Sequence, residues 1–218
     1  MSILSVVSVP EGIAMAADSR YTRTVTASDG SKTTFTLSDN GQKVMLLNKT
    51  PVGIAFCGNV MIQGKTVSDY IRLFEIRDIQ RGDTPEVVAH KLDARSSEFP
   101  DTTFYVCGYS RDLPYVYILT GGKLFRRNVN NKNQIIYNAF WAGEKIALSK
   151  MINAEPGMVI DANSMPLKDG IDMAEFMIDM TIKYQRFSNQ IATCGGPIDV
   201  LVLTKDNAFW HKHKLYAK

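Results

Sequence analysis

Cysteine is scarce in this sequence, and the few cysteines form no recognisable pair. Cys57, Cys107 and Cys194 are spread along 218 residues without a C-x-x-C motif. A sparse and odd count argues against a disulfide framework and fits buried thiols in a reducing compartment. We therefore expect a cytoplasmic protein that needs no disulfide bond.

The sequence has neither a large excess of one charge nor a long apolar run. The net charge is +3 and no block rich in Lys and Arg occurs, so nothing indicates nucleic-acid binding. The apolar start at residues 3–9 is too short to cross a bilayer and has no basic leader or small-residue cleavage site. We expect no membrane association. The hydrophobic content of 45% suits one compact domain over residues 1–218.

The local patterns predict strands and helices that occur in separate runs. Thr-rich arms around Asp29-Gly30 predict a hairpin over residues 22–36. Helical spacing of apolar residues, and Thr84 before Pro85 as a helix start, predict helices. The expected helices are 60–78, 84–99, 143–151 and 171–187, and the expected strands are 3–9, 13–17, 43–47, 52–57, 103–109, 114–119, 123–129, 197–204 and 208–215. Segregated runs of this kind predict an α+β fold with sheets and helices in different layers.

Ser2 stands directly behind the initiator methionine, which is removed most readily when a small residue follows. Removal would leave Ser2 with a hydroxyl group and a free α-amino group in one residue. The hydroxyl is a nucleophile, and the amine can serve as its base near neutral pH. Asp18 follows sixteen positions later, where the second apolar strand ends. The pattern indicates a nucleophile with a carboxylate nearby.

Three stretches of the chain resemble the proteasome β-subunit and bacterial HslV family of N-terminal-nucleophile hydrolases. Residues 12–20 form an apolar strand that ends in Ala-Asp-Ser-Arg, and residues 43–58 contain a Lys-led strand and a strand ending in Gly. Residues 194–203 look like the closing Gly-Gly strand of that family. The resemblance implies a four-layer α/β/β/α sandwich of two antiparallel sheets flanked by helices. It also implies a homo-oligomeric ring and no organic cofactor or metal.

The resemblance assigns a role to four residues. Ser2 is the expected nucleophile, and Lys43 beside it would favour the alkoxide, with Asp18 holding the lysine in place. Gly58 lies where the family's oxyanion-hole amide is found, and such a donor would stabilise the tetrahedral intermediate. The simpler alternatives are a surface salt bridge for Asp18 and Lys43 and an ordinary turn for Gly58.

The sequence also departs from the family pattern. The family's second acidic residue corresponds to Ile191, and its two supporting serines correspond to Cys194 and Ala142. These side chains normally hold the nucleophile's amine and its water. Their loss leaves Ser2, Asp18 and Lys43 without the usual polar surroundings.

These observations support three functional hypotheses. The first is a proteasome-like endopeptidase of the threonine-peptidase type that uses Ser2 and acts on peptides or unfolded proteins. The second is an inactive, ring-forming homologue, and the third is a transpeptidase or ligase that passes the acyl group to an amine. The sequence identifies no partner ATPase. His211 and His213 face one way on a strand, but without a third ligand they predict no metal site.

Overall fold

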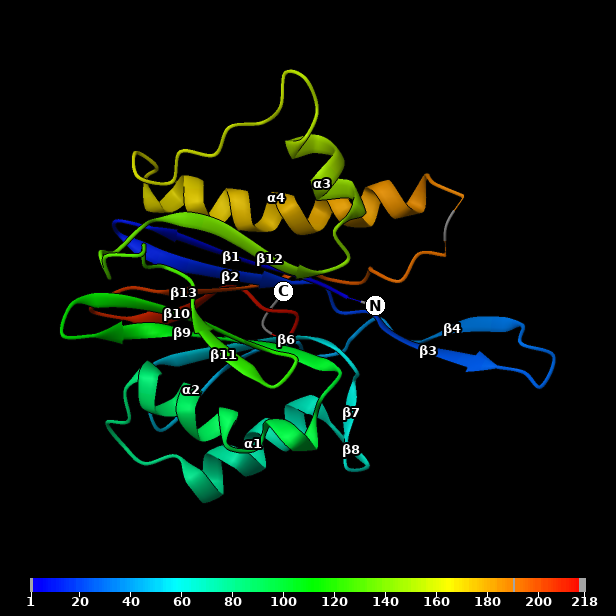
Figure 1. Ribbon diagram of the computed structural model, residues 1–218, viewed down its shortest axis with the longest axis horizontal. Coiled ribbons are helices and arrows are strands. Elements are labelled where there is room, and N and C mark those ends of the chain that lie inside the picture. The colour runs from blue at the N-terminus through cyan, green and yellow to red at the C-terminus, as the bar shows by residue number, and fades with distance from the viewer. Residues whose placement is uncertain (1, 190, 216–218) are drawn as a thin grey trace.

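The computed structural model describes residues 2–189 and 191–215 (Figure 1). These residues form a mixed α+β fold with antiparallel sheets and four α-helices. The α+β class and the antiparallel pairing predicted from the sequence are therefore confirmed.

The first five-stranded sheet contains the N-terminal strand. Its strand order is β12-β1-β2-β13-β14, and every neighbouring pair is antiparallel. The strands are, in that order, Asn138–Gly143, Ile3–Val9, Gly12–Ala17, Asp199–Leu203 and Ala208–Lys212. Both β1 and β2 are buried along their whole length, because protein covers the sheet on both faces. Continuous apolar runs are typical of strands in that position.

The second five-stranded sheet packs against the first. Its order is β11-β10-β9-β6-β5. The strands are Lys123–Arg126, Leu113–Thr120, Thr102–Ser110, Val52–Gly58 and Val44–Leu46. A buried cluster joins the two sheets, with Leu4 and Met15 from the first and Ala55 and Tyr105 from the second.

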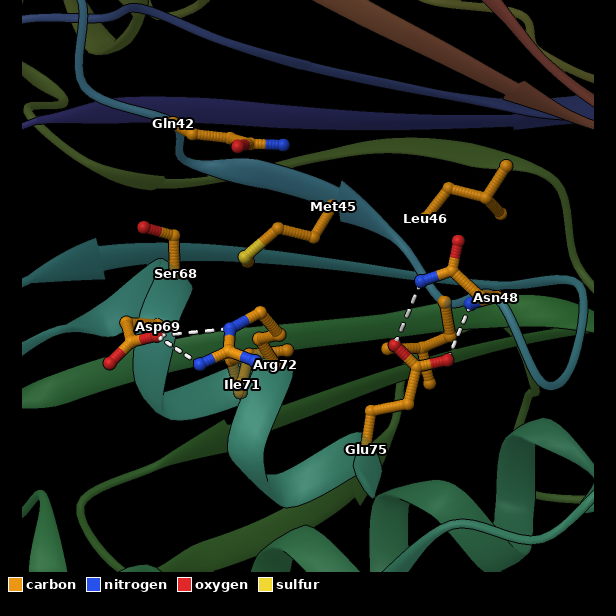
Figure 2. A pocket seen from close by; sticks show the side chains of 10 residues that line it. Gln42, Met45, Leu46, Asn48, Ser68, Asp69, Ile71, Arg72 and Glu75 are labelled. Atoms are coloured by element: carbon orange, nitrogen blue, oxygen red, sulfur yellow. Dashed lines mark hydrogen bonds and ion pairs between the residues drawn. The ribbon is translucent and has the colours of Figure 1, made fainter.

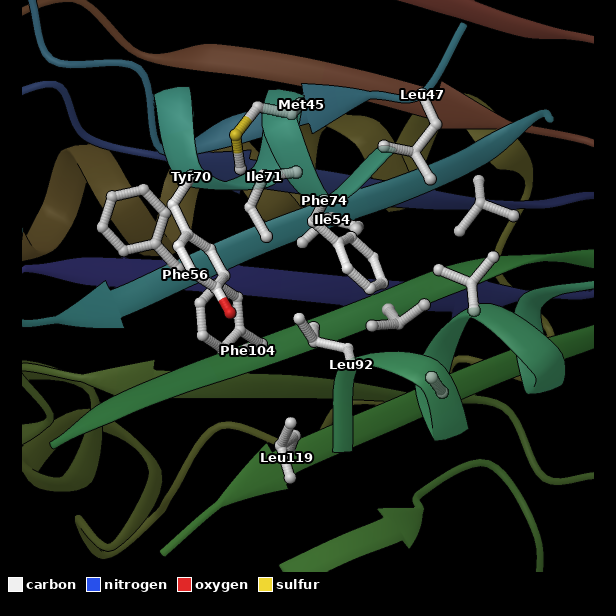
Figure 3. Close-up of a cluster of buried hydrophobic side chains, with 14 of the residues drawn as sticks. Met45, Leu47, Ile54, Phe56, Tyr70, Ile71, Phe74, Leu92, Phe104 and Leu119 are labelled. Carbon is white, nitrogen blue, oxygen red and sulfur yellow. The ribbon is translucent and has the colours of Figure 1, made fainter. Parts of the chain in front are cut away.

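The helices cover the outer faces of the two sheets (Figure 1). Helices α3 (Ile146–Ile152) and α4 (Leu167–Arg186) lie over the first sheet, and α1 (Val67–Asp78) and α2 (Pro85–Asp93) lie over the second. A short 3₁₀ helix, Ser96–Glu98, follows α2. Figure 3 shows the apolar cluster beneath α1 and α2, where Phe74 and Leu92 meet Phe56 and Phe104 of the sheet.

The helix expected over 60–78 begins later than predicted. Residues before it form a small hairpin, β7 (Met61–Ile62) and β8 (Lys65–Thr66), with a turn at Gly64. Helix α1 starts at Val67, because the side chain of Thr66 accepts the amide of Asp69 and caps the helix there. The predicted cap at Thr84 with Pro85 in the first turn is confirmed.

Strand β12 was missed by the sequence analysis, and two helix starts were displaced. Helix α3 begins at Ile146 rather than at 143, and α4 begins at Leu167 rather than at 171. The segment of β12 is short and mixes Asn, Ala, Phe and Trp, so it lacks a clear strand period. It becomes a strand by pairing with β1, from which it is distant in sequence.

A second hairpin, predicted over 22–36, is confirmed and projects from the body of the molecule (Figure 1). It consists of β3 (Tyr21–Thr26) and β4 (Lys32–Ser38). Val25, Phe35 and Leu37 are exposed on it. Within the described residues, no helix is both long and apolar enough to cross a membrane.

Candidate active site

Asp18 and Lys43 form a fully buried ion pair. The Lys43 Nζ lies 2.7 Å from Asp18 Oδ1, and neither side chain has exposed surface. The same carboxylate accepts the main-chain amides of Ile3 at 3.1 Å, Arg20 at 3.2 Å and Gly195 at 3.0 Å. A charged pair is tolerated in an interior only when hydrogen bonds satisfy it in this way. The interpretation of Asp18 and Lys43 as a surface salt bridge is therefore wrong.

Ser2 lies next to this pair and is held through its main chain. Its carbonyl accepts the amide of Glu144 at 2.8 Å, and its neighbour Ile3 donates to Asp18. Ser2 is only 1% exposed, and its hydroxyl has no hydrogen-bond partner among the described residues. A buried hydroxyl without a partner costs about 1–3 kcal/mol. Such a cost indicates a functional site when reactive groups lie close by.

The absence of a side chain at Gly143 leaves room for the main chain of Ser2. It ends β12 with φ +95°, and a side chain there would collide with the carbonyl of Ser2. A Cβ built on Gly143 would lie 3.4 Å from Cβ of Cys57, which precedes Gly58 at the end of β6. The ends of β12 and β6 therefore meet beside Ser2.

The backbone conformation at position 58 requires a glycine. Its φ is +114°, and a Cβ there would collide with the carbonyl of Asp101. The strand-end position expected from the sequence is confirmed, since Gly58 is the last residue of β6. Its role as an oxyanion donor stays a prediction.

The three positions that lack the family's polar side chains differ in exposure. Ile191 is 58% exposed, whereas Cys194 is buried and Ala142 is half-buried opposite Leu4. The amide of Gly195, the residue after Cys194, donates to Asp18. Sequence analysis missed Gly195, Glu144 and Gly143 as site residues, because main-chain donors and acceptors carry no residue signature.

Two buried cysteines near the ion pair, Cys57 and Cys194, are unreactive near neutral pH. Burial raises the pKa of the Cys57 thiol to about 12, and the Lys43 charge opposes this only in part. Burial also raises the pKa of Cys194 to about 12, with Asp18 adding to the effect. Both thiols are therefore protonated near neutral pH and do not act as nucleophiles.

We expect native protein at pH 8 to resist alkylation by iodoacetamide at Cys57 and Cys194. A pKa near 12 leaves roughly 10³-fold less thiolate at this pH than an ordinary cysteine has. Peptide mass spectrometry after timed labelling gives the rates, and urea-unfolded protein is the positive control. Native labelling as fast as that of the unfolded chain would contradict the burial of both thiols.

A separate cavity of about 320 Å³ opens between β5 and α1 (Figure 2). Its charged groups are already paired, since Arg72 bonds Asp69 and Glu75 accepts from Asn48. None of Ser2, Asp18 and Lys43 lines it. The described residues also contain no group of three His, Cys, Asp or Glu side chains that could hold a metal ion.

Comparison with known protein families and with curated proteins gives no match. The solved structures that resemble the chain include two of Anbu from Hyphomicrobium sp. strain MC1. A Gly-1 mutant of Anbu has 16% sequence identity and a TM-score of 0.65, over 98% of this chain and 86% of that one. A second Anbu structure has 16% identity and a TM-score of 0.61, over 97% and 86% of the two chains.

These findings correct the identification made from the sequence. At 16% identity the likeness concerns the fold alone, which this chain shares with Anbu. The assignment to the proteasome β-subunit and HslV family is wrong, because the two structures named above are of Anbu and no family model matches. The stretches that carried the resemblance are core strands, which mark a fold more than a family.

Proposed function

We propose that the protein is a peptidase whose nucleophile is Ser2, made competent by removal of Met1. The observation that carries the proposal is that Ser2, whose buried hydroxyl has no partner among the described residues, adjoins the buried Asp18–Lys43 pair through the amide of Ile3. A second serine shows why the pair matters. Ser8, in the strand β1 that follows Ser2, also has a buried hydroxyl without a partner among the described residues, but it pairs with Ile13 and Asn138, at the end of the strand far from Asp18.

In the proposed reaction the Ser2 oxygen attacks the carbonyl carbon of a peptide bond. The α-amino group takes the hydroxyl proton and then gives it to the leaving amine as the C–N bond breaks. The result is an ester on Ser2 and a free amine product. Water then attacks the ester with the amine again as base, which releases the acid and restores Ser2.

Lys43, Asp18 and Gly58 would stabilise the charges that form during the reaction. The Lys43 ammonium favours the alkoxide of Ser2 and the unprotonated amine, and Asp18 offsets the cost of burying that ammonium. The amide of Gly58 would donate to the developing oxyanion, a contribution often worth about 10²–10³ in rate.

We also propose the wider context of this activity. The layering of helices and sheets supports a four-layer α/β/β/α sandwich of the N-terminal-nucleophile type, built as one domain over residues 1–218. We propose a homo-oligomeric assembly in the cytoplasm that acts on peptides or unfolded polypeptides. Mass measurement of the native assembly tests the oligomer.

The intact mass of natively expressed protein, before and after an epoxyketone, tests the peptidase. This reagent reacts with a hydroxyl and an amine held in one residue. We expect loss of Met1 and one adduct, which Ser2→Ala abolishes. Ser8→Ala is the matched control and keeps the adduct, because Ser8 is equally buried but lies away from Asp18 and Lys43.

A retained Met1 together with no adduct would contradict the peptidase and favour the inactive homologue. If the adduct forms, addition of a competing peptide amine separates hydrolysis from transfer. Ligated product in place of acid would identify a transpeptidase or ligase.

A further inference from the structure

An ion pair that the proposed mechanism does not use stands beside Asp18. The guanidinium of Arg20 contacts the carboxylate of Asp39 in a bidentate manner, with Nε–Oδ1 at 2.6 Å and Nη2–Oδ2 at 2.9 Å. Its third nitrogen, Nη1, donates to the carbonyl of Ala192 at 3.0 Å. Each partner favours the charged form of the other: Asp39 raises the pKa of Arg20, and Arg20 lowers the pKa of Asp39. Bidentate pairs of this kind fix geometry as well as charge.

The guanidinium also rests on Gly195. A Cβ placed on Gly195 would lie 2.6 Å from Cζ of Arg20, so the two groups are in close contact. Gly196 packs in the same way on the main chain of Asp39. The pair therefore holds the loop of residues 192–196 on one side.

The other side of this loop is held by helix α4. Gln185, buried in the last turn of the helix, accepts the amide of Cys194 at 2.8 Å and bonds Thr193. The amide of Ser19 donates to the carbonyl of Gly195 at 2.9 Å. With both sides fixed, the amide of Gly195 points at Asp18 Oδ2, 3.0 Å away.

We propose that Arg20 and Asp39 are a positioning pair that keeps the Gly195 amide on the carboxylate of Asp18. The inference rests on the proposed function for its catalytic consequence, since Asp18 in turn orients Lys43 beside Ser2. It assigns to a loop and an ion pair the positioning of Asp18, which is separate from the missing polar contacts at Ile191, Cys194 and Ala142. A pair that merely closes the β3–β4 hairpin, whose ends Arg20 and Asp39 adjoin, would leave Gly195 in place when removed.

The test has one arm that needs no activity. In Arg20→Ala, amide hydrogen exchange at Gly195, followed by NMR, should accelerate by about 10–100-fold, because the loop opens locally. Exchange at Val202 in the core strand β13 should not change. Guanidinium chloride, far below denaturing concentration, should restore the protection of Gly195, and sodium chloride at equal ionic strength should not.

The second arm measures turnover of a fluorogenic peptide. Arg20→Ala should lower kcat by about tenfold with KM little changed, since a misplaced group slows chemistry more than binding. Guanidinium should rescue kcat as well. The matched control Asp179→Asn removes an exposed ion pair with Lys183 and should change neither readout.

The two arms separate the two proposals. Wild-type protein without turnover would contradict the peptidase, and the exchange arm would still decide the position of Gly195. Unchanged exchange at Gly195 in Arg20→Ala would overturn the positioning pair. An active enzyme whose kcat is unaffected by Arg20→Ala would overturn it too.

Discussion

Replacing Lys43 by methionine is expected to lower the free energy of unfolding by about 3–5 kcal/mol, because the charge of Asp18 would be left buried and unpaired. Methionine has nearly the length of lysine, so packing changes little. The two charged groups lie 2.7 Å apart, and neither side chain is exposed to solvent. Urea denaturation followed by circular dichroism gives the free energy for both proteins.

A double-mutant cycle assigns this loss to the pair. Asp18→Asn combined with Lys43→Met should recover part of the stability, because no charge then stays buried. The matched control is Lys168→Met, which removes an exposed ion pair with Asp172 and should cost less than about 1 kcal/mol. A loss for Lys43→Met as small as that of the control would mean that water reaches the pair.

The core of the fold was predictable from short-range patterns. β1 and β2 are runs of apolar and small residues around a turn, and such runs favour burial on both faces. The hairpin at Asp29-Gly30 follows from turn chemistry in the same way. Each of these features is encoded in a short, continuous stretch of chain.

The candidate site could be predicted only through resemblance. Asp18 and Lys43 are separated by a projecting hairpin, and nothing local distinguishes them from a surface pair. β12 was missed because its pairing with β1 joins segments far apart in the chain. The donors that complete the site are main-chain amides at Gly195 and Glu144, and their positions follow from tertiary packing rather than from residue type.

The resemblance led to the right fold class, α+β with antiparallel sheets, and to the wrong family, for one physical reason. Core strands tolerate many sequences that keep their apolar pattern, so distant chains share them. Ile191, Cys194 and Ala142 were the residues that departed from the family pattern. These polar positions, and not the apolar strands, were the part of the sequence that already disagreed with the family.

Gly143→Ala is expected to be the most damaging substitution that adds a single methyl group. The φ of +95° disfavours any side chain, and the new Cβ would collide with the carbonyl of Ser2. The strain and the collision together should cost about 3–5 kcal/mol of unfolding free energy. The obstacle is main chain, which cannot move aside as a flexible side chain would.

The control for Gly143→Ala separates strain from collision. Gly82 has a similar φ of +86°, but no atom lies within 4 Å of the place that a Cβ would take there. Gly82→Ala should therefore cost only the conformational strain, about 1–2 kcal/mol. Urea denaturation measures both, and epoxyketone labelling of the folded fraction should fail for Gly143→Ala alone. Equal costs and equal labelling would mean that β12 does not hold Ser2. A larger cost with lost labelling would show that the nucleophile depends on a strand paired across a long stretch of chain, because the Ser2 carbonyl is bound where β12 ends.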